Sequence, residues 1–216
     1  MDSVFEELWW AGGIQNIYDL KDEAKNISDF DQTHIVKGYA IYNLPFGQGK
    51  KLLSTVGPVA NAVIGGWSLV GNFHYNTGTP TSVHSTNWTA NDAGSIYVNL
   101  APGCSLTNSG GKKLGGQFLN PKCYQNPANG YLGTGGNNQS QARNPGFATE
   151  DLGLHKSIKM GPDGRYSLTG RIEFFNVFNR DGLAGPDQGL GDGSFGQING
   201  YGEGGRIGQY GLRLTF

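Results

Sequence analysis

The feature that most constrains this chain is an alternation of apolar and polar residues with a period of two, which begins near His34 and recurs in five segments. A period of two places successive side chains on opposite faces of an extended strand. We therefore predict strands over 35–44, 67–77, 149–160, 165–178 and 206–216. The adjacent Phe174 and Phe175 interrupt the alternation, which predicts a β-bulge. A short helix is predicted near 59–64.

Each predicted strand has one face of large apolar residues and one face of polar or charged residues. In segment 67–77, the apolar face holds Trp67, Leu69, Phe73 and Tyr75, and the polar face holds Ser68, Asn72, His74 and Asn76. Lipid suits the first face and a water-filled lumen suits the second, as in membrane β-barrels. A soluble β-sandwich, whose strands also alternate, is the alternative.

The connections between these strands differ in length. A tight-turn sequence, 161–164, joins the third strand to the fourth, and 45–66 joins the first to the second. The other two connections are about 70 residues (79–148) and about 27 residues (179–205) long, and the strand order places both at the same end. A loop of that length argues against a compact soluble domain. Membrane barrels, in contrast, have short periplasmic turns and long extracellular loops.

We therefore predict an all-β fold of about five antiparallel amphipathic strands, forming an incomplete transmembrane β-barrel with long extracellular loops. Residues 1–33 are expected to be an N-terminal connector, and 34–216 a barrel segment that includes the loops 79–148 and 179–205. Five strands cannot close, because closed bacterial barrels begin at eight. The chain is therefore expected to be the C-terminal end of something larger: a fragment, a truncated gene product or one piece of a split assembly.

Composition excludes several other classes of protein. The chain has 216 residues, 37 of them glycine, 12% aromatic residues, 15% charged residues and a formal net charge of −1. No basic excess indicates binding to nucleic acid. The glycines have no three-residue period, so the chain is not collagen-like. No apolar run approaches the 20 residues of a membrane helix, and the N-terminus has no signal-peptide pattern.

The two cysteines, Cys104 and Cys123, lie in one region rich in glycine, asparagine and serine. Their number and spacing do not fit a zinc site. We predict a disulfide, which implies an oxidising compartment. Two unpaired surface thiols are the alternative.

Signals of enzyme chemistry are weak, and we predict no catalytic, cofactor-binding or metal-binding residues. The segment 200–205 fits GxGxxG but leads into a strand rather than a helix, so it lacks the dinucleotide context. Polar residues expected on the lumen face are His74, His155, Arg171 and Glu173. The two histidines can bind a metal or a ligand group, or simply be satisfied polar groups of the lumen. For Arg171 and Glu173 an ion-pair network is favoured over acid–base catalysis.

The long loop carries aromatic residues among small polar ones. Candidate ligand contacts are Trp88, Tyr97, Tyr124 and Tyr131. Aromatic residues in this context can form an adaptable binding surface. They can equally pack beneath the loop and give it a small core.

The last eight residues, 209–216, fit the pattern of the β-signal that the barrel-assembly machinery recognises, with Gln209, Gly211, Leu214 and Phe216 at its defined positions. Several other motifs resemble the late barrel of TonB-dependent outer-membrane receptors. The closest resemblance is to the Oar-like group, whose members often carry a carboxypeptidase-regulatory-like domain. These motifs are 29–34 (DFDQTH), 44–50 (LPFGQGK), 65–69 (GGWSL), 171–179 (RIEFFNVFN) and 194–198 (SFGQI), within about 14–78 and 143–216.

The resemblance implies a bacterial outer-membrane protein of the cell surface. Its role would be to form barrel wall and extracellular ligand-binding loops of a receptor or transporter. Implied partners are outer-membrane lipid, the rest of the barrel and its plug or other copies of the chain, the barrel-assembly machinery, and an unknown small ligand, oligopeptide or carbohydrate. The alternative is a receptor-derived β-sheet module that self-assembles or pairs with other chains in an oligomeric barrel or filament. A secreted enzyme has no motif to support it.

Overall fold

The computed structural model describes residues 27–86, 96–135, 139–161 and 164–216. They form two compact units. The strand unit comprises His34–Asn76, Phe147–Asp181 and Gly204–Phe216, and the loop unit comprises residues 27–33, Thr77–Gly146 and Gly182–Glu203. The expected connector, 1–33, lies largely outside the described residues.

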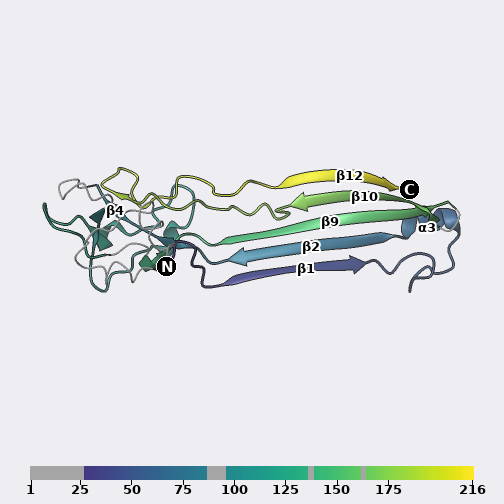
Figure 1. Cartoon of the computed structure of the whole chain (residues 1–216), viewed down its shortest axis with the longest axis horizontal. Coiled ribbons are helices and arrows are strands. Elements are labelled where there is room, and N and C mark those ends of the chain that lie inside the picture. Colours follow the sequence, from purple (N-terminus) through teal and green to yellow (C-terminus); the bar gives the residue numbers. More distant parts are fainter. Residues whose placement is uncertain (1–26, 87–95, 136–138, 162–163) are drawn as a thin grey trace, which may run out of the picture. The chain divides into compact units, whose positions relative to one another are not determined.

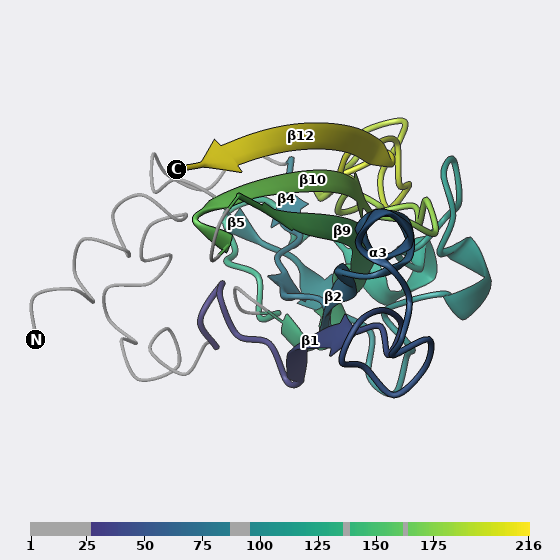
Figure 2. The same ribbon diagram turned by 90° about the vertical axis from the view of Figure 1, so that its right-hand side faces the viewer.

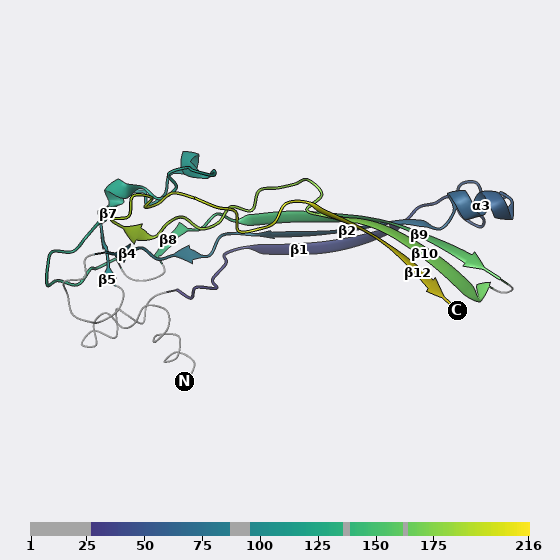
Figure 3. The ribbon, with the colours of Figure 1, turned by 90° about the horizontal axis from the view of Figure 1, so that it is seen from above.

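The strand unit is a five-stranded antiparallel sheet in the order β1-β2-β9-β10-β12 (Figure 1). Its strands are β1 (Ile35–Asn43), β2 (Trp67–Asn76), β9 (Phe147–Met160), β10 (Tyr166–Phe175) and β12 (Ile207–Thr215). The predicted strands are thus confirmed to within a few residues. The sheet is twisted, and in Figure 3 β12 crosses the direction of β1. In the described residues the sheet does not close, since β1 and β12 have one neighbour each.

The two ends of this sheet differ in their connections. At the turn end, the connection from β1 to β2 contains α3 (Pro58–Ile64) (Figures 1 and 2). At the same end, the connection from β9 to β10 includes Gly161 and Gly164, both with positive φ. At the loop end, β2 leads into the long insertion before β9, and β10 leads into the connection to β12. Gly66 is required at the turn end, because a Cβ on it would lie 2.1 Å from the Ser157 carbonyl oxygen.

The predicted bulge at Phe174 and Phe175 is wrong, and β10 ends at Phe175 rather than at Phe178. β10 keeps its register with β12 as far as the pair Phe175–Ile207. Asn176 then adopts a φ of 50°, a conformation that asparagine tolerates better than most residues. Its backbone N–H donates to Asp151 at 2.8 Å, and its side-chain oxygen accepts from the Arg180 N–H at 2.7 Å. These bonds end the strand.

The loop unit contains short two-stranded and three-stranded sheets instead of long strands. They are β3 (Pro80–Thr81) with β8 (Gln139–Arg143), β6 (Asn99–Leu100) with β7 (Tyr124–Gln125), and β11 (Gly189–Leu190) with β4 (His84–Ser85) and β5 (Ile96–Tyr97). Its described residues also include the 3-10 turns η1 (Ser109–Gly111) and η2 (Pro121–Cys123).

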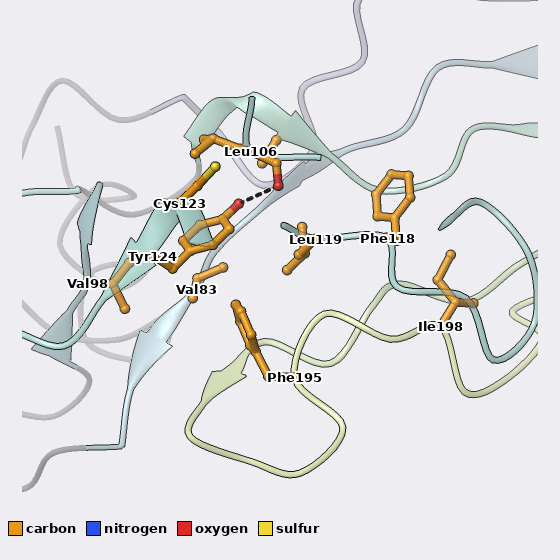
Figure 4. Close-up of a cluster of buried hydrophobic side chains, with 10 residues drawn as sticks. Val83, Val98, Leu106, Phe118, Leu119, Cys123, Tyr124, Phe195 and Ile198 are labelled. Atoms are coloured by element: carbon orange, nitrogen blue, oxygen red, sulfur yellow. Dashed lines mark hydrogen bonds between the residues drawn. The ribbon is translucent and has the colours of Figure 1, made fainter. Parts of the chain in front are cut away.

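A small hydrophobic core holds the loop unit together (Figure 4). Its members include Val83, Val98, Leu106, Phe118, Leu119, Tyr124, Phe195 and Ile198. Residues from both long connections therefore share one core. Cys104 and Cys123 are joined by a disulfide with their Cα atoms 5.6 Å apart, and Cys123 is itself fully buried.

We predict that the disulfide is a main source of stability for the loop unit. It closes a loop with a sequence separation of 19 residues, which corresponds to about 3 kcal/mol of chain entropy. In the double variant Cys104→Ser/Cys123→Ser, the loop unit should therefore unfold at a lower denaturant concentration than in the parent chain. Hydrogen exchange resolved by peptide will measure this loss.

Reductant provides the matched control. It should destabilise the parent chain by a similar amount and leave the doubly substituted variant unchanged. Equal protection of the oxidised and reduced loop unit would contradict the prediction.

Candidate functional site

The register of the sheet gathers the large apolar side chains on one face, here called the apolar face. In one cross-strand row Leu69 pairs with Leu154, Leu154 with Ile172, and Ile172 with Tyr210. The face comprises Val36, Tyr42, Trp67, Leu69, Phe73, Tyr75, Leu152, Leu154, Ile158, Met160, Tyr166, Leu168, Ile172, Phe174, Tyr210, Leu212 and Leu214. Many of these side chains are exposed, up to 89% for Tyr210. A contiguous apolar surface of this kind needs a non-aqueous or protein partner.

Two charged residues on the apolar face have their charges satisfied locally. Glu150 receives two hydrogen bonds from the Arg180 guanidinium, at 2.6 and 2.8 Å. The Lys156 ammonium donates to the Val63 carbonyl at 3.0 Å and to the Gly65 carbonyl, and lies 4.9 Å from the centre of the Trp67 ring. Charged side chains in an apolar setting are expected to be paired or to extend to the interface. Both residues meet this requirement.

The opposite face, here called the polar face, carries the polar residues of the same strands. It includes Lys37, Ser68, Asn72, His74, Thr149, Asp151, His155, Ser157, Lys159, Ser167, Thr169, Arg171, Glu173, Gln209, Arg213 and Thr215. The first strand alternates least, because Ile35, Tyr39 and Ile41 also lie on this face.

A hydrogen-bonded cluster occupies the middle of the polar face. His155 Nε2 lies 2.9 Å from Glu173 Oε1, and Gln209 Nε2 donates to Glu173 Oε2 at 2.8 Å. Arg171 Nη1 lies 4.0 Å from Glu173 Oε1. Both carboxylate oxygens of Glu173 are therefore engaged. This arrangement is typical of an ion-pair network rather than of an acid–base pair, whose carboxylate must face a substrate.

The structure separates one of the four residues expected in the lumen from the others. His155, Arg171 and Glu173 meet in the cluster, whereas His74 packs edge-to-face on Phe147 with ring centres 5.6 Å apart. Gln209 joins the cluster because it pairs directly with Glu173 in the ladder. Gln209 and Glu173 both occupy polar positions of alternating strands. The sequence could have placed Gln209 in the cluster only if the register between the two strands had been known.

The residues of the C-terminal signal lie on the outermost strand. Gln209, Gly211 and Leu214 belong to β12, and Phe216 follows it with 90% of its surface exposed. Because β12 pairs only with β10 in the described sheet, its other backbone edge is open.

The aromatic residues proposed as ligand contacts of the long loop divide between core and surface. Tyr97 and Tyr124 are buried, and the Tyr124 hydroxyl donates to the Leu106 carbonyl at 3.2 Å (Figure 4). Their burial favours the alternative stated for these residues, in which they pack beneath the loop and contribute to its small core. Tyr131 is 70% exposed, and Trp88 lies outside the described residues.

Burial also sets the electrostatics of the loop unit. It raises the pKa of the Tyr124 hydroxyl and lowers the pKa of His84 below its usual 6.5. In the described part of the chain, His84 Nδ1 is buried and accepts no hydrogen bond. Charging this imidazole in the folded state is therefore unfavourable.

We predict that acid destabilises the loop unit through His84. The unfolded chain binds a proton near pH 6.5 and the folded unit only at lower pH, so stability is full above pH 6.5 and falls as the pH drops below it. His84 is the only one of the 4 histidines within the loop unit. Hydrogen exchange of the loop unit between pH 7.5 and 5 will measure the effect. His84→Gln should flatten the dependence, and an unchanged slope in this variant would refute the assignment.

A second prediction concerns the two faces of β9. Arginine in place of Leu154 puts a charge on the apolar face and should destabilise the inserted sheet by about 2–4 kcal/mol. Ser157→Arg on the polar face of the same strand is the matched control and should cost less than about 1 kcal/mol. Urea unfolding in lipid vesicles measures both. Equal losses would contradict the assignment of the faces.

No helix in the described residues is long and apolar enough to cross a membrane. Those residues also contain no group of three or more metal-ligating side chains of the His, Cys, Asp or Glu type. The expectations that the chain is not an enzyme and uses no cofactor stay predictions.

Comparisons with known proteins agree with the amphipathic sheet. A family model described as "Outer membrane beta barrel domain" matches residues 2–209, nearly the whole chain. No curated protein and no solved structure matches the chain. The match leaves out Met1 and residues 210–216, which include most of β12, and it explains the exposed apolar face as a surface in contact with membrane lipid. The chain belongs to the family of outer-membrane β-barrel domains.

Proposed function

We propose that the chain is the C-terminal barrel segment of a TonB-dependent outer-membrane receptor of the Oar-like type. The observation that carries this proposal is an amphipathic antiparallel sheet whose two longest connections leave from the same end. The motifs at 29–34, 44–50, 65–69 and 171–179, and the terminal segment 209–216, support the finer family. In this role the sheet supplies wall, with lipid on the apolar face and the lumen on the polar face.

The orientation follows from the lengths of the connections. In outer-membrane barrels the short turns are periplasmic and the long loops extracellular. The turn end would therefore face the periplasm, and the loop unit would lie outside the cell. A loop unit with its own core and a disulfide is an ordered structure, which suits the binding of an extracellular ligand. The rest of the barrel and a plug would complete the receptor.

A second candidate function is self-assembly, in an oligomeric barrel or a filament. The observation in its favour is that both edge strands of the described sheet, β1 and β12, have nine residues and an open edge. Open edges of this length template further pairing. Measuring the size of the chain in mild detergent separates the two functions, since a homogeneous oligomer of this chain alone favours assembly.

The test of the leading proposal uses the terminal strand. Expressed with a secretion signal in a bacterial host, the chain should partition into the outer membrane. Phe216→Ala should lower the inserted fraction severalfold, because it removes the terminal aromatic residue of the proposed β-signal. The measurement is the amount of chain in washed outer membranes.

Thr215→Ala is the control, because Thr215 is a neighbouring exposed residue at an undefined position of the signal. It should leave insertion unchanged. A fully soluble, monodisperse parent chain would contradict the receptor proposal. Equal insertion of the two variants would contradict the role of Phe216 in the proposed β-signal.

A further inference from the structure

A groove of about 420 Å³ lies on the polar face, toward the loop end of β1, β2 and β9. Its polar lining consists of Lys37, Tyr39, Asn72, His74, Thr149 and Asp151. All six belong to the strand unit. The groove is distinct from the Glu173 cluster, which involves β9, β10 and β12.

The ladder fixes these six side chains in two rows. Lys37 pairs with His74, and His74 with Thr149, in the first row. Tyr39 pairs with Asn72, and Asn72 with Asp151, in the second row. Strands lie about 4.8 Å apart, and residues of one face follow each other at about 6.6 Å. The six side chains thus rise from one patch, and three hydrogen-bonded strands set their spacing.

The polar groups of the groove have unused hydrogen-bonding capacity. In the parts of the chain that the structure describes, the Lys37 ammonium, the Tyr39 and Thr149 hydroxyls and the Asn72 amide make no hydrogen bond or ion pair. Asp151 Oδ1 accepts the Asn176 N–H at 2.8 Å, which leaves Oδ2 open. Glu173, by contrast, uses both of its oxygens within the sheet. The groove is therefore equipped to bond to something else.

The charges of the groove indicate what that ligand is. Lys37 and Asp151 lie at diagonally opposite corners of the patch, two strands and two residues apart, about 12 Å between their backbones. The neutral residues between them donate and accept hydrogen bonds, and Tyr39 is 83% exposed. A ligand that satisfies both corners has an anionic end, a cationic end and an amide-like middle.

We propose that the groove binds a short zwitterionic peptide, with its carboxylate on Lys37 and its ammonium on Asp151. Three extended residues span about 10 Å, and the Lys37 side chain covers the remaining distance. Charge-assisted hydrogen bonds at both ends supply the selectivity. A neutral oligosaccharide carries no charged group that could pair with Lys37 or Asp151. The inference rests on the proposed function in one respect, namely that the polar face lines a lumen open to the medium.

The experiment measures peptide binding to the full chain refolded in detergent micelles, with its β content checked by circular dichroism. The probes are trialanine, N-acetyl-trialanine, trialanine amide and maltotriose, titrated by calorimetry. Trialanine should bind, and each capped peptide should bind at least tenfold more weakly. Equal binding of free and capped peptides, binding of maltotriose in place of trialanine, or no binding by a folded chain would overturn the proposal.

Two variants assign the ends of the peptide. Lys37→Met should abolish the preference for the free carboxylate and keep the preference for the free amine. Asp151→Asn should do the reverse, and asparagine retains an oxygen that can accept the Asn176 N–H. Lys159→Met, on the same face of β9 but outside the groove, should bind trialanine like the parent. A preference that survives both groove variants would overturn the assignment.

This experiment and the membrane-insertion test fail separately. Binding is read in micelles, whereas the receptor role is read in cells. If the chain inserts into the membrane but binds no peptide, only the proposal of peptide binding is contradicted. If it binds peptide but does not enter the membrane, only the proposed receptor role is contradicted.

Discussion

The antiparallel ladder is the interaction on which the rest of the structure depends. Its register decides which face every side chain of the strand unit occupies, and a slip of one residue would exchange the two faces of a strand. With the observed register, Leu69, Leu154 and Ile172 form one row and His155 and Arg171 another. The lipid-facing surface, the Glu173 cluster and the groove at Lys37 all follow from this single alignment.

Much of the strand unit could be predicted because alternation is a local signal. Each strand was found within a few residues, and so was α3. The end of β10 was misplaced because it depends on Asn176, whose bonds to Asp151 and Arg180 come from residues 25 and 4 positions away. A propensity scale does not contain such contacts. The pairing of Gln209 with Glu173 likewise requires the register, which the alternation alone leaves open.

The loop unit was the less predictable part, because its order arises from contacts between distant segments. Gln117 donates to the carbonyls of Leu119 and Phe195, the second of which is 78 residues away. For Tyr97 and Tyr124 the sequence left open whether they form a binding surface or a small core, because their neighbours in the sequence are small and polar. Both are buried in the structure, where the Tyr124 ring packs edge-to-face on Phe195 from the other long connection. Composition could not decide between the two readings, whereas the packing does.

The unequal lengths of the strands have a geometric consequence. β9 has 14 residues and pairs with β2 from Phe147 to Lys156 but with β10 from Leu152 to Met160, so its two neighbours are offset along it. Beyond the pair Trp67–Lys156, β9 continues along β10 without β2 beside it. In a cylindrical wall, such a stagger is shear, and shear together with the number of strands determines both the radius and the inclination of the strands to the axis. In a closed barrel wall the offset at Lys156 would incline the strands to the barrel axis, so that lipid at one depth would meet different positions on successive strands.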